Sequence, residues 1–117
     1  MKKILFATSL LAAAGMAHAA AYGANAVTSG TAITVADCGL LNTDASVKIT
    51  LSTGNVAAYD CNSSTANIGV AVGNQTGKNK VFAIGSNGGS VTTYTTSSAP
   101  QAGDVSSAAS TMAASSS

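Results

Sequence analysis

The segment SVKITLS, residues 46–52, decides the fold class. Its apolar residues Val47, Ile49 and Leu51 alternate with serine, lysine and threonine. Successive side chains of a β-strand point to opposite faces, so this period of two predicts a strand with one buried face. No stretch beyond residue 19 shows a comparable period of 3.6 residues, which would indicate an amphipathic helix.

Strand character recurs along the chain in short segments that are separated by glycine, asparagine and serine. These further predicted strands are residues 31–38, 55–61, 66–73, 80–85 and 90–96. Short strands with short connections predict an all-β fold, a small antiparallel sandwich or barrel-like sheet of about six strands. Thr53 and Gly54 are expected to join the strands on either side of them as a tight hairpin.

The first residues have the pattern of a secretory signal. Lys2 and Lys3 precede an apolar run over 4–16, and Ala17-His18-Ala19 has the small-x-small form of a cleavage site. The apolar run is shorter than the ~20 residues that span a bilayer. We therefore expect a cleaved signal helix over 1–19, Sec-type export to the periplasm, the cell surface or the extracellular space, and no membrane insertion after cleavage.

The rest of the chain divides by composition. Residues 20–30 are expected to form an N-terminal arm or an edge strand, and residues 31–96 the β-domain. Residues 97–117 are almost entirely serine, alanine and glycine, with the single proline, Pro100. Such a composition is typical of flexible segments, so we expect a disordered Ser/Ala-rich tail over 97–117.

The charge balance limits the functions open to this chain. It has 117 residues, of which 8% are charged, and a net charge of +1. Beyond residue 19 the sequence contains three lysines and four aspartates but no arginine, glutamate or histidine. We therefore expect no nucleic-acid binding, which requires a basic surface, and no histidine-based zinc site or nucleophile pair. The sequence predicts a protein that is not an enzyme and holds no cofactor.

Two cysteines, Cys38 and Cys61, lie in the exported part of the chain. An even number of cysteines in an oxidising compartment favours a disulfide. If residues 31–38, 46–52 and 55–61 run up, down and up, both cysteines end at the same edge of the sheet. The alternative is a pair of free buried thiols. A bridge would stabilise a domain that has few large apolar side chains to bury.

Two groups of residues are candidate sites, and each has a structural alternative. Asp37 and Asp60 each precede a cysteine, so a bridge would bring them together with Asp44 and Asn42, and such oxygens can hold Ca²⁺ or share a proton. The alternative is that the aspartates cap turns or face water. The tyrosines could form a carbohydrate-stacking face, or they are ordinary core and sheet residues: Tyr22, Tyr59 and Tyr94.

The surface must consist mainly of threonine, serine, asparagine and alanine because charges are so few. Uncharged sheet edges are poorly protected against pairing with another chain. The sequence therefore predicts a structural or interaction protein of the cell surface or extracellular matrix that self-assembles into a homo-oligomer. The alternative is a periplasmic or secreted binding module for a glycan or small ligand, with a calcium-dependent form of binding as one version of it.

Overall fold

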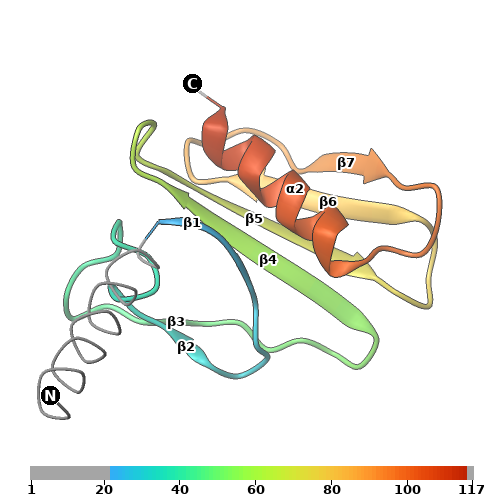
Figure 1. Ribbon diagram of the computed structural model, residues 1–117, viewed down its shortest axis with the longest axis horizontal. Coiled ribbons are helices and arrows are strands. Elements are labelled where there is room, and N and C mark those ends of the chain that lie inside the picture. Colours follow the sequence, from blue (N-terminus) through green and yellow to red (C-terminus); the bar gives the residue numbers. More distant parts are fainter. Residues whose placement is uncertain (1–21, 116–117) are drawn as a thin grey trace, which may run out of the picture.

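The structure is a computed structural model that describes residues 22–115. The predicted signal, residues 1–19, lies outside this part of the chain. Seven strands and one helix follow one another in the order β1 to β7 and then α2, and the strands form a five-stranded and a two-stranded sheet (Figure 1).

The five-stranded sheet is antiparallel throughout, in the order β1-β4-β5-β6-β7. Its strands are β1 (Gly23–Ala26), β4 (Asn55–Asn62), β5 (Asn67–Asn74), β6 (Lys80–Gly85) and β7 (Thr92–Thr95). The longest pairing joins β4 to β5, from Asn55 opposite Asn74 to Asn62 opposite Asn67. The strands predicted at 66–73 and 80–85 are thus present, because their apolar and polar residues alternate as a sheet with two different faces requires.

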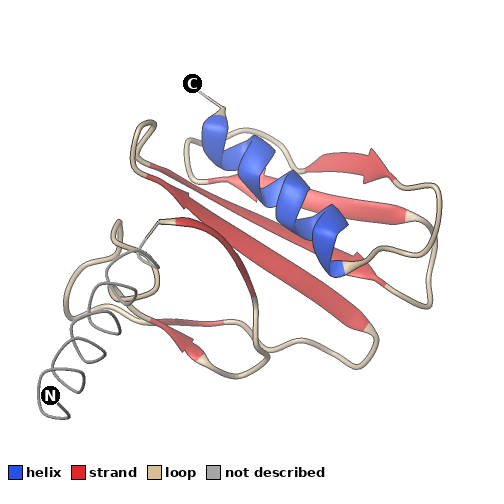
Figure 2. Cartoon of the chain, viewed as in Figure 1, coloured by secondary structure: helices blue, strands red, loops and turns tan. Residues whose placement is uncertain are grey.

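One face of the sheet is covered by the helix α2 (Ala102–Ala114), which crosses the central strands (Figure 2). The helix buries Val105 and three alanines against Ala58, Ala71 and Val81. This packing is close enough that a Cβ atom added at Gly69 would collide with the carbonyl oxygen of Ala109. Glycine in a strand is typical of a place where another backbone approaches closely.

Both ends of α2 are held by hydrogen bonds. At the start, the Gln101 backbone N–H donates to the Asp104 carboxylate (2.8 Å), which is half of a capping box. At the end, the Asn67 amide donates to the Ser115 carbonyl (2.7 Å), and the Thr65 hydroxyl donates to the Ala113 carbonyl (2.6 Å). Terminal carbonyls have no partner within a helix, so these side chains supply the missing donors.

The helix corrects the prediction of a flexible tail over 97–117. Residues 102–114 are ordered against the sheet, while 116 and 117 lie outside the described residues. Four small or medium side chains provide the buried face of α2, and the alanines among them are too small to give a clear apolar period in the sequence.

The opposite face of the sheet carries the short strands β2 (Ala32–Ile33) and β3 (Val47–Lys48), which pair only with each other among the described residues. The disulfide between Cys38 and Cys61 ties this layer to β4. Around the bridge, Tyr59 is buried with half-buried neighbours that include Leu41 and Ile68.

The observed architecture is an open sheet between a helix and a small second layer, so neither a sandwich nor a barrel closes within the described residues. The predicted strands at 31–38 and 46–52 shrink to two residues each. The hairpin expected at Thr53-Gly54 is not one, because β3 and β4 belong to different sheets. Within the segment 20–30, Gly23–Ala26 form β1, which pairs with β4 at one end of the sheet.

Candidate functional site

The disulfide joins the loop after β2 to the end of β4. The sulfur atoms of Cys38 and Cys61 are 2.05 Å apart, their Cα atoms are 5.7 Å apart, and both residues are buried. The bridge therefore links two layers rather than two strands of one sheet edge. Disulfides persist in oxidising compartments, so the bond indicates a location outside the cytoplasm.

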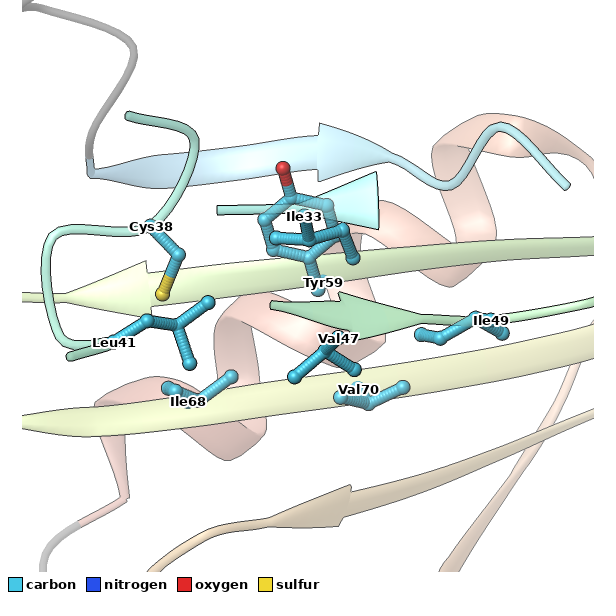
Figure 3. A pocket seen from close by; sticks show the side chains of 8 residues that line it. All are labelled: Ile33, Cys38, Leu41, Val47, Ile49, Tyr59, Ile68 and Val70. Carbon is cyan, nitrogen blue, oxygen red and sulfur yellow. The ribbon is translucent and has the colours of Figure 1, made fainter. Parts of the chain in front are cut away.

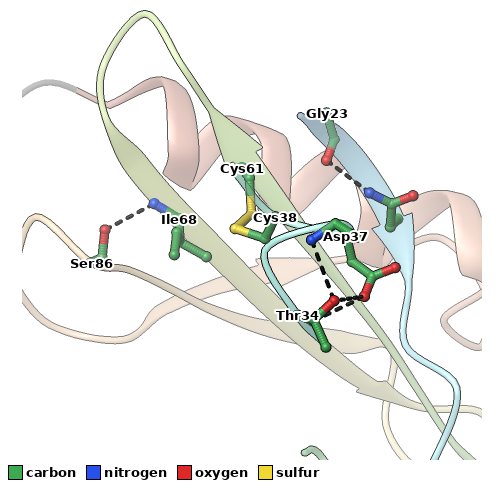
Figure 4. The surroundings of a disulfide bond; sticks show 9 residues. Gly23, Thr34, Asp37, Cys38, Cys61, Ile68 and Ser86 are labelled. Atoms are coloured by element: carbon green, nitrogen blue, oxygen red, sulfur yellow. Dashed lines mark hydrogen bonds between the residues drawn. A yellow bond between two sulfur atoms is a disulfide. The ribbon is translucent and has the colours of Figure 1, made fainter. Parts of the chain in front are cut away.

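Asp37 caps a turn beside the bridge (Figure 4). Its carboxylate accepts hydrogen bonds from the backbone N–H (2.9 Å) and the hydroxyl (3.1 Å) of Thr34. The Asp37 N–H in turn donates to the Thr34 carbonyl (2.9 Å). This reciprocal pattern is that of a capping box, in which a side chain accepts from the backbone N–H three residues before it, and it accounts for an aspartate at this position without any ligand.

The other residues of the predicted calcium group lie elsewhere. Asp60 alternates with Cys61 along β4 and is buried on the face that α2 covers, opposite the side of Asp37. Asp44 and Asn42 are exposed in the loop before β3, where the Asn42 carbonyl accepts from the Ala45 N–H (3.0 Å). Within residues 22–115, no three or more histidine, cysteine or acidic side chains are grouped as metal ligands would be.

The three tyrosines do not share a surface. Tyr59 is buried beside the disulfide, and burial, followed by the negative charge of Asp37, raises the pKa of its phenol. Tyr94 faces α2 and its hydroxyl donates to the Met112 sulfur (3.6 Å). Tyr22 is exposed next to Gly39. A carbohydrate face built from all three stays a prediction from the sequence.

An apolar cavity of about 60 Å³ lies between the sheet and the β2–β3 layer (Figure 3). Val47 and Ile49 line it from above, and Tyr59, Ile68 and Val70 line it from the sheet. Two of the three apolar residues of the predicted strand 46–52 thus line the cavity, but the face is not buried as expected, because Val47 stays 44% exposed. Among the described residues that line the cavity, only the tyrosine carries a polar group. The cavity therefore provides apolar contacts but no set of side chains for catalysis or for binding a polar ligand.

Beyond this cavity, no further layer among residues 22–115 covers the same sheet face. Over β5, β6 and the residue that precedes β7 it presents an apolar row that we call the open face: Val72 (37% exposed), Phe82 (47%), Ile84 (43%) and Val91 (56%). At one end of the open face, a shallow hollow is bordered by Lys78 and Lys80. The sequence analysis did not identify this row, since alternation shows that one face is apolar but not how much of it is covered.

The two edges of the sheet are the strands β1 and β7. At β1, the Asn25 side-chain amide donates to the Gly23 carbonyl of the same strand (3.3 Å). At β7, the sequence TTYT carries no charge and no proline, and within residues 22–115 its outer side has no backbone hydrogen bond. Natural edge strands are usually blocked by charge, proline or a bulge, so β7 is an unprotected edge.

Comparison with known proteins identifies no relative: no family model, no curated protein and no solved structure matches the chain. Among the described residues, no helix has the length and the apolar character needed to cross a membrane.

Proposed function

We propose that the protein is an exported structural protein that self-associates outside the cytoplasm through the β7 edge, as part of a cell-surface or extracellular assembly. The observation that carries the proposal is the unprotected edge itself. The disulfide supports a location outside the cytoplasm. The low net charge of the chain, +1 overall, gives little electrostatic repulsion between copies. The proposed role is a non-enzymatic one.

An antiparallel edge strand can pair with the same strand of a second copy about a twofold axis. Pairing β7 with β7 would join two five-stranded sheets into one continuous sheet, with both α2 helices on the same side. The residues that meet are threonine and tyrosine, which are favourable in strands and bring no like charges together.

Sedimentation velocity of the oxidised, exported protein over a wide concentration range tests this proposal. We expect a concentration-dependent dimer or larger species in the wild type. Thr93→Lys puts a charge on the edge strand and should shift association to concentrations about tenfold higher or more, because two copies would meet with like charges.

The matched control is Ser63→Lys, which adds the same charge at an exposed position in the β4–β5 turn and should associate as the wild type does. A wild-type protein that stays monomeric at every concentration contradicts self-assembly. Equal loss of association in both variants contradicts the assignment to β7.

A further inference from the structure

The second layer of the molecule covers only part of the sheet. In Figure 3, β2 and β3 lie in front of β4 and its neighbours, and β6 lies beyond the free side of β3. Among residues 22–115, the side chains of Phe82 and Ile84 on β6 stay 47% and 43% exposed. The cavity lining agrees, since Val47 and Ile49 of the upper layer meet Ile68 and Val70 of β5. The open face continues directly from Val70 onto Val72, Phe82 and Ile84.

The strand at the border of the open face is itself unpaired on that side. β3 pairs with β2 and with no other strand among the described residues, and its free side is turned toward β6 (Figure 3). The layer therefore ends in a free strand edge that stands directly beside an apolar surface. One more strand at this position would satisfy the backbone of β3 and cover the open face.

Charge around the open face has one sign. Lys80 belongs to the same row of β6 as Phe82 and Ile84, and Lys78 lies beside it in the turn before this strand. Lys48 lies on β3 itself. The described residues contain no other lysine. Of the four aspartates, Asp37 and Asp44 lie in loops, Asp60 lies beneath α2, and Asp104 lies in the first turn of α2.

We propose that the open face binds an extended segment of a partner protein that adds to the free edge of β3. The segment would alternate apolar and polar side chains, so that its apolar side covers Phe82 and Ile84, and would carry acidic residues at the end that reaches Lys78 and Lys80. This is β-strand addition, in which main-chain hydrogen bonds give affinity and alternate side chains give specificity.

A strand fits this surface better than a second folded copy of the chain. A stable contact between globular proteins buries about 800 Å² on each partner. Four side chains that are already partly covered supply much less area than that. The inference is also independent of pairing at β7, because edge pairing extends the sheet and leaves the open face uncovered.

The test uses fluorescence anisotropy of a labelled short peptide in which valine alternates with threonine and two aspartates follow. We expect saturable binding to the oxidised protein and binding that is weaker by about tenfold when lysines replace the aspartates. Lys80→Glu should remove this preference, because the new carboxylate offsets the charge of Lys78, and Ile84→Asp should abolish binding. Ser107→Asp, at an exposed position of α2, is the matched control and should bind as the wild type does.

Amide hydrogen exchange locates the bound peptide. Slower exchange over residues 46–50 supports addition to β3. Slower exchange at Thr92–Thr95 instead would move the peptide to the β7 edge and overturn the inference, as would the absence of saturable binding or equal affinity for the acidic and basic peptides. Loss of self-association at β7 would leave all these outcomes unchanged, so the two proposals fail separately.

Discussion

The two faces of the five-stranded sheet are covered in different ways. On the α2 side, glycine and alanine let a helix backbone approach a strand backbone, and the helix ends are held by side chains from the turns. On the other side, a disulfide holds two very short strands over a small cavity, and these strands cover only part of the sheet. We infer that the α2 face provides most of the packing, and our proposal places binding on the incompletely covered face.

The largest loss of stability is expected when a side chain is placed between the helix and the sheet. Gly69→Val places atoms where the Ala109 carbonyl lies, and neither backbone can move without disturbing the sheet or the helix. We expect the free energy of unfolding to fall by about 3 kcal/mol or more, the upper end for overpacked sites. Urea unfolding followed by circular dichroism measures the change.

Gly103→Ala is the matched control for this substitution. Gly103 lies in the first turn of α2, and an added Cβ meets no atom within 4 Å. Alanine is the better helix former by up to about 1 kcal/mol, so this variant should be as stable as the wild type or more so. A Gly69→Val variant that unfolds at the same urea concentration as the wild type would contradict the close packing of helix and sheet.

Removal of the disulfide probes the other face and should have the next largest effect. The bridge closes a loop of 23 residues, and the chain-entropy model assigns such a loop about 3 kcal/mol. In Cys38→Ala/Cys61→Ala we expect a loss of about this size. Amide exchange should quicken first over residues 31–49, while β5 and β6 beneath α2 keep their protection. Uniform loss of protection across the sheet would show that the two faces do not unfold separately.

The sequence predicted the strands whose two faces differ and missed the parts that depend on small residues. β5 and β6 alternate larger side chains with glycine, alanine or polar residues, and both were predicted to within one residue. The helix was missed because Ala108, Ala109 and Ala113 form its buried face, and alanine also occurs on its exposed side. A local signal was present in Pro100, Gln101 and Asp104, which mark a helix start.

Of the candidate site, only the disulfide could be predicted from the sequence. The disulfide is confirmed, because two cysteines allow only one pair, but the expected arrangement of three neighbouring strands is wrong, since the bridge joins two layers. The proximity of Asp37 and Asp60 was expected from their places beside the cysteines, but neighbours along a strand point to opposite faces, and the sheet separates them. The open face could not be predicted, since its exposure depends on where the second layer ends.

The smallest effect is a pH dependence that belongs to the disulfide face alone. Burial first, and the charge of Asp37 second, raise the pKa of Tyr59 above its ordinary value of 10.0. The unfolded chain therefore releases this proton at a lower pH than the folded protein does. Above pH 10 the folded state binds more protons, so the free energy of unfolding should fall as the pH rises toward the folded pKa.

Tyr59→Phe should remove this decline while changing stability at neutral pH by no more than about 1 kcal/mol, since the hydroxyl is one polar group. Tyr22→Phe, at an exposed tyrosine, should keep the decline and serves as the control. Urea unfolding at several alkaline pH values, with phenolate absorbance followed in parallel, measures both. If the decline persists in Tyr59→Phe, then the β2–β3 layer does not shield this phenol, and the disulfide face is more open than its buried cysteines imply.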